Sequence, residues 1–244
     1  MHAPQQIGLH RSLRTADVGP VRAGGDSVAL VALLYKATLT PTKIELLQTW
    51  APKQPWLGDV DTTTVEAVGS YRFDDPDGEV GMETHLLRGA DGHILQVPVT
   101  YRGAPMAGAD SLLIGTMQHS VLGERWMYDA CGDPVYVRAL ATVVLSGGTH
   151  AQLDVVTDAG QVRLDATTQV SGSGSGDSEI PPIGPVSLSN EGTETFIRVP
   201  HLELTLLRAI DPGRESDVPT GQQRLVGTWP GHDDPALLAL AQIT

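Results

Sequence analysis

The sequence predicts an α+β protein that is mostly β, with a curved antiparallel sheet and a few short flanking helices. Three observations predict this class. Apolar residues alternate at period two in runs of strand length, turns rich in Gly and Asp separate these runs, and few segments combine a helix start signal with a helical apolar stripe. The 244 residues, 41% of them apolar, can bury a substantial core.

A core strand and a short helix are expected to begin the fold. The apolar run predicts a strand over Val28–Leu39. Thr42 and Glu45 have the spacing of a capping box, which opens a helix, and Pro52 must follow its end because proline cannot continue a helix. The helical residues expected to face inward are Leu46, Leu47 and Trp50.

An antiparallel meander is expected next. Val65–Phe73 runs into the turn Asp74–Gly78, and the chain returns at period two through Val80, Met82, Thr84 and Leu86. The strand His93–Tyr101 places Leu95, Val97, Val99 and Tyr101 on one face. Pro98 in this strand indicates the edge of the sheet, because proline has no N–H to donate. Two further strands are expected near Leu112–Val121 and Glu124–Tyr128.

A second helix and further strands are expected after the meander. Asp133 followed by Pro134 predicts a helix start, and Gly147 predicts its end. Strands are then expected over Gln152–Thr157, Gln161–Val170, Thr193–Ile210, in one or two pieces, and Gln223–Trp229. Asp234 and Pro235 predict a final short helix.

We expect residues 1–26 to form a flexible tail and residues 27–244 to form a single domain. The stretch 171–185, rich in Gly and Ser and then in Pro, interrupts the later strands and is compatible with a linker between two domains. A mobile loop inside one domain is favoured, because the strands after it are too few for an independent sheet.

Charge and cysteine content disfavour several classes of partner. The 16 Lys and Arg residues against 29 Asp and Glu residues give a formal net charge of −13, which repels nucleic-acid phosphates and anionic membranes. No apolar run has the length of a membrane span, and no secretory signal is visible. The single Cys131 agrees with a reducing compartment. We therefore expect a cytoplasmic protein without nucleic-acid or membrane partners.

The common motifs of phosphoryl transfer and hydrolysis are absent from the sequence. The Gly/Ser stretch contains no lysine and precedes no helix, unlike a phosphate-binding P-loop. Neither phenylalanine follows an aspartate, no His-Arg-Asp or His-Gly-Asp loop occurs, and Ser120 is not in a Gly-x-Ser-x-Gly turn. We therefore expect no enzymatic activity from this chain alone, and no cofactor.

Two clusters hold possible metal ligands. The acidic run Asp74–Glu79 offers carboxylates to a cation, but its spacing is not that of an EF-hand and its Asp-Pro-Asp-Gly sequence favours a simple turn. Glu83 and His85 share one strand face, and His119 is expected near them. Such a set can bind a metal or transfer a proton, although its spacing favours a structural role, and we expect no metal.

Aromatic residues concentrate between positions 50 and 136. Core packing accounts for most of them, and we expect one or two to be exposed for docking or for stacking on a sugar. The candidate docking or ligand residues are Trp56, Tyr71, Tyr101, Arg102, His119, Arg125, Trp126, Tyr128, Asp129 and Asp133.

Several segments resemble the N-terminal cap of bacterial maltokinases. They are Lys36–Trp50 with Pro52, Gln54 and Trp56, then Tyr71–Glu83, Val97–Pro105, His119–Asp129 and Gly132–Tyr136, with Gly227–Gly231 near the end. They are most similar to stand-alone cap-like proteins related to maltokinases and to a glucosamine-kinase group. The resemblance covers about residues 27–146. It implies a curved antiparallel sheet with flanking helices, which packs against the nucleotide-binding lobe in the full-length kinases.

The departures from the family pattern are as informative as the match. In the kinases Arg-Trp-Phe follows the residue that corresponds to Gln54, whereas Pro55, Trp56 and Leu57 follow it here, and the catalytic body is absent. The resemblance therefore implies a fold and a metabolic context, maltose, trehalose and α-glucan metabolism, without any catalytic residue.

Three functions remain open. The favoured one is an accessory module that docks on a separate sugar kinase or on an α-glucan or trehalose enzyme. The second is a sensor of a sugar or nucleotide in the concave sheet, which requires a pocket with convergent polar groups. The third is an unrecognised enzyme or a component of a split sugar kinase, which requires Asp129, Asp133 and His119 to come within hydrogen-bond reach or one water of each other.

Overall fold

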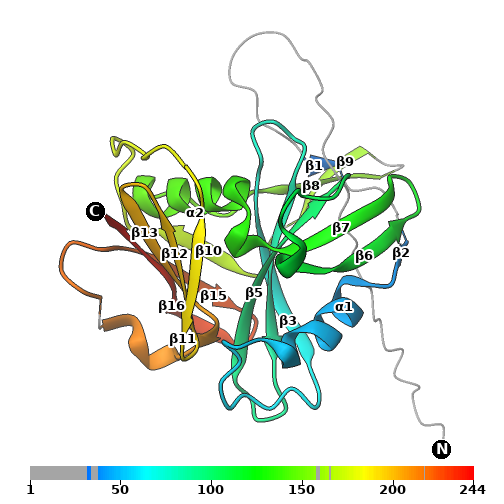
Figure 1. Cartoon of the computed structure of the whole chain (residues 1–244), viewed down its shortest axis with the longest axis horizontal. Coiled ribbons are helices and arrows are strands. Elements are labelled where there is room, and N and C mark those ends of the chain that lie inside the picture. Colours follow the sequence, from blue (N-terminus) through cyan, green and yellow to red (C-terminus); the bar gives the residue numbers. More distant parts are fainter. Residues whose placement is uncertain (1–31, 34–37, 158–159, 165, 217) are drawn as a thin grey trace, which may run out of the picture.

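The computed structural model of the chain describes residues 32–33, 38–157, 160–164, 166–216 and 218–244. These residues form three sheets and two α-helices, so the protein is mostly β, as predicted (Figure 1). The predicted tail 1–26 and most of the predicted strand Val28–Leu39 lie outside the described residues.

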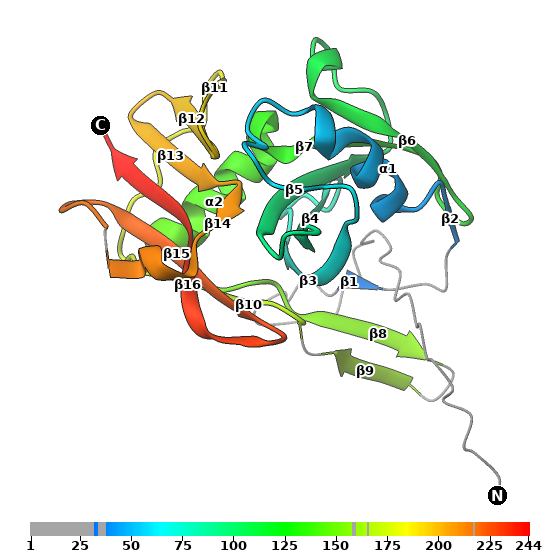
Figure 2. The same cartoon turned by 90° about the horizontal axis from the view of Figure 1, so that it is seen from below.

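The central sheet curls around α1 (Lys43–Trp50) and the 3-10 turn η1 (Ala51–Lys53) (Figure 2). Its strands are β2 (Leu39–Thr40), β3 (Glu66–Phe73), β4 (Gly81–Arg88), β5 (Ile94–Arg102), β6 (Leu113–His119) and β7 (Gly123–Asp129). They are ordered β2-β6-β7-β5-β4-β3, and β14 (Ala209–Ile210) also pairs with β5. Every pairing is antiparallel, which confirms the predicted meander.

A second antiparallel sheet is built mainly from the C-terminal part of the chain. Its strands are β10 (Gln169–Gly172), β11 (Ser187–Glu191), β12 (Glu194–Val199), β13 (Leu202–Leu207), β15 (Gln223–Trp229) and β16 (His232–Ile243), in the order β10-β15-β16-β13-β12-β11. The helix α2 (Pro134–Ser146) packs against β3 of the central sheet and against β10, β15 and β16, so it joins the two sheets (Figure 1).

The remaining strands form a small sheet that extends away from the two larger ones (Figure 2). It contains β1 (Ala32–Leu33), β8 (Leu153–Thr157) and β9 (Gly160–Leu164), with β1 parallel to β8. Three further 3-10 turns, η2 (Asp110–Leu112), η3 (Ala130–Gly132) and η4 (Pro212–Ser216), connect the strands.

The two strands β4 and β5 are buried on both faces of the central sheet. The β5 residues predicted to share a face, Leu95, Val97, Val99 and Tyr101, pack together in the cluster under α1. On the opposite face Val80, Met82 and Leu86 enter a larger cluster with α2 and the second sheet. The period-two alternation therefore predicted the faces correctly.

The two helices begin and end where the sequence predicts. Thr42 accepts the N–H of Glu45, and the Glu45 carboxylate accepts the N–H of Thr42, which is the reciprocal bonding of a capping box. Asp133 accepts the N–H of Val135 at the start of α2, and Gly147 ends this helix with a φ of 72°, a left-handed conformation that glycine adopts without strain.

The predicted edge position of β5 is wrong. The strand pairs with β4 on one side and with β14 and then β7 on the other. The N–H of Gln96 points toward the β14 side, where it donates to the Arg208 carbonyl at 2.7 Å. Because N–H groups alternate along a strand, the Pro98 nitrogen faces the same side, between the β14 and β7 pairings, where no ladder bond is lost.

Two other predictions about the C-terminal half need correction. The segment Gln161–Val170 is not one strand, because β9 and β10 belong to different sheets. The final helix expected at Asp234 and Pro235 is instead β16, a central strand between β13 and β15. Pro235 falls where the β15–β16 register is irregular, so its missing N–H costs no ladder bond.

The Gly/Ser stretch lies against the C-terminal end of α2. The N–H groups of Gly174 and Ser175 donate to the carbonyls of Val144 and Leu145, each at 3.0 Å. A Cβ on Gly174 would lie 1.8 Å from the Leu145 carbonyl oxygen, so only glycine fits there. The single domain and the mobility of residues 171–185 stay predictions.

One buried amide ties the central sheet to the second sheet. The Gln96 Nε2 of β5 donates to the carbonyls of Leu207 and Leu238, each at 2.9 Å. Its Oε1 accepts the hydroxyl of Tyr71 at 2.8 Å. The fully buried amide is therefore bonded through both its nitrogen and its oxygen.

Candidate functional site

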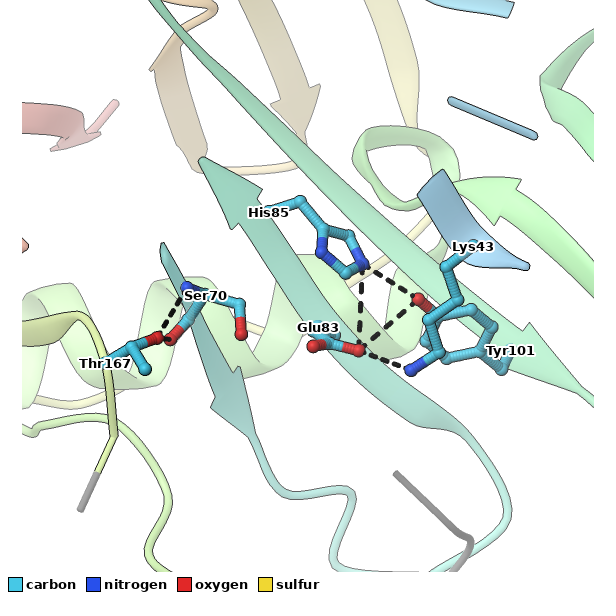
Figure 3. A network of polar contacts seen from close by, with 6 residues as sticks. All are labelled: Lys43, Ser70, Glu83, His85, Tyr101 and Thr167. Atoms are coloured by element: carbon cyan, nitrogen blue, oxygen red, sulfur yellow. Dashed lines mark hydrogen bonds and ion pairs between the residues drawn. The ribbon is translucent and has the colours of Figure 1, made fainter. Parts of the chain in front are cut away.

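A cluster of polar side chains lies on the α1 face of the central sheet (Figure 3). Glu83 and His85 stand two residues apart on β4, so they share a face as predicted. Tyr101 reaches them from β5, and Lys43 reaches them from the first turn of α1. The capping box that starts α1 therefore also sets the position of the lysine.

The other three side chains converge on one carboxylate oxygen of Glu83. Glu83 Oε2 lies 2.5 Å from Lys43 Nζ and 3.7 Å from His85 Nε2. It also accepts the Tyr101 hydroxyl at 3.4 Å, and that hydroxyl lies 3.1 Å from His85 Nε2. The Lys43 ammonium lies 4.2 Å from the centre of the Tyr101 ring, a distance typical of a cation–π contact.

Burial and charge act against each other in this cluster. Burial alone would raise the pKa of Glu83, but the charges of Lys43 and His85, the Lys43 hydrogen bond and the charge of Arg72 outweigh it and hold that pKa well below its usual value. Burial lowers the pKa of His85, although the Glu83 charge opposes this shift. The arrangement thus favours an ionised Glu83.

A small cavity of about 30 Å³ lies beside the cluster. Among the described residues, the charged side chains that line it are Lys43, Arg72, Arg125 and Glu83. Sites that enclose whole small molecules usually measure about 300–1,000 Å³. This cavity therefore has polar groups that converge, but it is too small to enclose a sugar ring or a nucleoside.

A larger groove of about 530 Å³ lies between the β3–β4 turn and α2. Its walls are largely apolar, with Val135, Ala139 and Ile183 among them. Its charged lining residues among those described are Asp74, Asp75, Asp77 and Arg138, so three carboxylates accompany one guanidinium. Burial raises the pKa of Asp74, against the opposing charge of Arg72. The volume of the groove lies within the range of ligand pockets.

The acidic run forms the turn that its sequence predicts. The Asp75 carboxylate accepts the N–H groups of Asp77, Glu79 and Val80 at 3.2, 3.0 and 2.9 Å. Among the residues that the structure describes, no three His, Cys, Asp or Glu side chains are grouped so that they could hold a metal ion.

Most of the candidate aromatic residues are buried, so core packing accounts for them, as expected for the majority. Trp56 and Tyr71 belong to the core, each with 1% of its surface exposed, and Tyr128 accepts the N–H of Met106 from a buried position. Tyr101 lies in the polar cluster, and Trp126 is half-buried. Alternation along strands predicts which residues share a face, but not that a helix or second sheet covers each face.

The candidate aspartates are held in ion pairs. Arg102 forms a bidentate ion pair with Asp133, in which Nε donates to Oδ2 at 2.8 Å and Nη2 donates to Oδ1 at 2.7 Å. Asp129 accepts Arg208 Nη2 at 2.7 Å.

The sequence analysis missed Arg208, which lies with its guanidinium 4.5 Å from the Trp56 ring centre. Its only sequence signal is a lone charge after the apolar run Leu204–Leu207. Arg208 Nη2 also lies 3.2 Å from the Sγ of Cys131. Burial raises the pKa of that thiol well above its usual value, against the opposing charge of Arg208.

The three residues on which the enzyme alternative depended do not converge. His119 pairs with Gly123 at one end of the β6–β7 hairpin, and Asp129 lies six residues further along β7. At about 3.3 Å per residue, this separation is about 20 Å. No direct or single-water contact between His119 and Asp129 fits that geometry.

The curled antiparallel sheet with α1 on one face agrees with the curved sheet and flanking helices that the sequence resemblance implies. The family model of the maltokinase N-terminal cap domain matches residues 50–133 of the 244. This stretch runs from the last residue of α1 to the N-cap of α2 and contains β3 to β7.

A search of curated proteins finds no match to the chain. Neither α1 nor α2, nor any shorter helical turn among the described residues, has the length and apolar character needed to cross a membrane.

Proposed function

We propose that the chain is a non-catalytic accessory module that docks on a separate sugar kinase or on another enzyme of maltose, trehalose or α-glucan metabolism. The observation that carries the proposal is the match of residues 50–133 to a domain named as the cap of a maltokinase. A cap is one part of a larger assembly, so a chain built around a cap-like sheet is suited to act beside a partner. The single buried Cys131 supports a reducing compartment, the cytoplasm, as the place of action.

The internal use of the charged residues supports the non-catalytic role. Glu83, Asp129 and Asp133 are each paired with a cation of the same chain, at 2.5 to 2.7 Å. A carboxylate that is held by a neighbouring cation stabilises the fold and is less available as a general base.

The groove between the β3–β4 turn and α2 is the docking surface that we assign to this function. Its apolar walls favour an apolar segment of the partner, and Asp74 and Asp77 at its side favour a neighbouring Lys or Arg. The net charge of −13 extends this preference to the whole molecule, because it attracts a basic partner surface over a longer range.

A matched pair of variants tests the docking surface. Thr142 on α2 and Thr49 on α1 are both exposed and both donate to the carbonyl four residues before them. Thr142→Tyr fills the groove, whereas Thr49→Tyr adds the same bulk elsewhere. With the purified chain and the sugar kinase or α-glucan enzyme of its source, we expect Thr142→Tyr to weaken association at least tenfold, as measured by calorimetry. Equal binding by the wild type and both variants would reject the groove, and no binding by the wild type to any such enzyme would reject the accessory role.

The size of the groove also favours a second candidate function, a small-molecule sensor. Ligand binding to the folded state raises the melting temperature, so maltose, trehalose, glucosamine and ATP with Mg²⁺ can be compared by thermal shift. A shift that Thr142→Tyr removes and Thr49→Tyr keeps would support the sensor, whereas no shift with any of these compounds would count against it.

A further inference from the structure

The groove between the β3–β4 turn and α2 combines apolar walls with negative charge. Its lining residues among those described carry three carboxylates, all in the β3–β4 turn, against one guanidinium on α2. Asp75 accepts N–H groups of its own turn, whereas Asp74 is half-buried and Asp77 is exposed. Burial raises the pKa of Asp74, so a further cation beside it would stabilise its ionised form. The groove therefore suits a segment that is both apolar and basic.

The sequence before the described residues contains a segment of this kind. Residues 7–14 read Ile-Gly-Leu-His-Arg-Ser-Leu-Arg, so apolar side chains alternate with basic ones and no acidic residue interrupts them. In the whole chain, by contrast, 29 Asp and Glu residues outnumber 16 Lys and Arg residues. We call residues 7–14 the basic segment. Its charge and apolar content are complementary to those of the groove.

The direction of β1 leads the chain from the side of the groove. β1 runs parallel to β8, with Ala32 beside Leu153. In a parallel pair the two strands begin at the same end, so the chain enters β1 on the side of the residues that precede Leu153. Thr149 and Ala151 lie on that side, and both line the groove. The chain from Arg14 to Ala32, about 18 residues, spans up to about 60 Å when extended, so the basic segment can reach the groove.

We propose that the basic segment binds in this groove of its own chain, with its apolar side chains against the walls and Arg11 and Arg14 beside the carboxylates of the β3–β4 turn. Because segment and groove belong to one chain, the effective concentration of the segment is in the millimolar range, and a modest affinity suffices. The regulatory consequence rests on the proposed function: where the groove is the docking surface, the segment competes with the partner and lowers its affinity.

Limited proteolysis of the full chain with trypsin tests the proposal without any partner, because trypsin cuts after arginine. Thr142→Tyr fills the groove, and we expect it to raise the initial rates of cleavage after Arg11 and Arg14 at least fivefold. The rate after Arg22, which lies outside the basic segment, should stay the same. Thr49→Tyr is the matched control and should leave all three rates unchanged. Mass spectrometry of the early products identifies each cut.

Two results of this experiment would overturn the proposal. They are equal rates after Arg11 and Arg14 in the wild type and Thr142→Tyr, and a rise that is as large after Arg22 as after the other two. If Thr142→Tyr fails to fold, Asp77→Asn replaces it, with Asp233→Asn at the start of β16 as control, since both aspartates are exposed. Asp77→Asn should raise the two rates at least twofold, and unchanged rates would reject the proposal.

A binding experiment separates this proposal from the accessory role. In calorimetry with the sugar kinase or α-glucan enzyme, we expect the double variant Arg11→Gln, Arg14→Gln to bind at least threefold more tightly than the wild type. Arg22→Gln is the control and should bind like the wild type. Equal affinity of the wild type and the double variant would reject the competition. If no such enzyme binds, the accessory role fails, and the cleavage rates alone decide whether the basic segment occupies the groove.

Discussion

Arg208 is enclosed by groups from distant parts of the chain: Asp129 ends β7, Cys131 lies in η3, Thr195 lies on β12, and Trp56 follows η1. Only 1% of its side chain is exposed. A buried ion pair is not strongly stabilising in itself, but removal of one member leaves the other charge buried and unpaired.

We expect Arg208→Gln to destabilise the protein by about 3–5 kcal/mol, because Asp129 then lacks its counter-charge. Arg198→Gln is the control, since the Arg198–Glu203 pair is half-exposed and a surface pair is worth at most about 1 kcal/mol. Urea unfolding measures both. Equal losses in the two variants would contradict the structural role assigned to Arg208.

The buried His85 should make stability depend on pH. Because burial lowers its pKa in the folded state, the unfolded chain binds the proton more tightly, and stability falls as the pH drops from about 6.5 toward the lower folded value. Glu83, whose folded pKa is also lowered, loses its contribution only below its unfolded pKa, at more acidic pH.

We expect the free energy of unfolding to depend less on pH in His85→Gln than in the wild type between about pH 5 and 6.5. One titrating group can contribute at most about 1.4 kcal/mol per pH unit to this slope. His93→Gln removes an imidazole that is 63% exposed and should change the slope little. Urea unfolding across this pH range gives the comparison. A slope that His85→Gln leaves intact would show that His85 does not titrate as its burial predicts.

Single-residue roles were predictable from the sequence only where the signal is local. The N-cap function of Asp133 follows from the proline after it, and the shared face of Glu83 and His85 follows from their spacing. The pairing of Asp129 with Arg208 was not predictable, because 79 residues separate them and several other arginines were equally available.

At the level of elements, the contact between the Gly/Ser stretch and α2 depends on two glycines. A Cβ would lie 2.0 Å from the Val143 carbonyl oxygen at Gly172 and 1.8 Å from the Leu145 carbonyl oxygen at Gly174. Backbone atoms cannot move aside as a flexible side chain can, so the helix and the stretch would have to separate.

We expect Gly174→Ala to cost about 3 kcal/mol, because the new methyl group overlaps the backbone of α2. Gly176→Ala is the control two residues further on, where a Cβ meets no atom within 4 Å and the change should stay within about 0.5 kcal/mol. Thermal unfolding compares them. A Gly174→Ala protein as stable as the wild type would mean that the stretch is not held against α2, as a mobile loop requires.

The helices and strands were predicted well where the apolar pattern and the turn or capping residues agree. They were predicted less well where contacts with distant strands determine the secondary structure. The capping box and the Asp-Pro-Asp-Gly turn specify their own local structure. The run Ala236–Ala241 has residues that favour a helix, yet it pairs with strands on both sides and is buried, so tertiary pairing overrides its propensity.

At the scale of the whole molecule, Gln96 is the polar link between the two large sheets. Its replacement by an apolar residue would remove one hydrogen bond from each of two carbonyls and from the Tyr71 hydroxyl in the interior. Each such group costs about 1–3 kcal/mol when its bond is lost.

We expect Gln96→Leu to destabilise the protein by at least ~3 kcal/mol and to broaden its unfolding, because the two sheets lose their shared bonds. Gln118→Leu on β6 is the control, since Gln118 is exposed. Urea unfolding followed by circular dichroism gives both the midpoint and the slope. An unchanged midpoint in Gln96→Leu would exclude the link.

The packing of the helices and the second sheet on β4 and β5 could not be predicted from the sequence. Alternation predicted that β4 and β5 each have an apolar face, but both strands are covered on two faces, by α1 on one and by α2 with the second sheet on the other. This double cover removes Trp56, Tyr71 and Tyr128 from the surface, whereas the groove beside α2 stays open.

The position of Cys131 makes its reaction with a thiol reagent a measure of how often the core opens. It is the only thiol in the chain, it is fully buried beside Arg208, and its raised pKa keeps it protonated and unreactive while the core is closed. A thiol reagent in excess should therefore react at the rate at which the core around Cys131 opens. The rate of labelling with and without a partner present would therefore measure how much the partner slows the opening of the core.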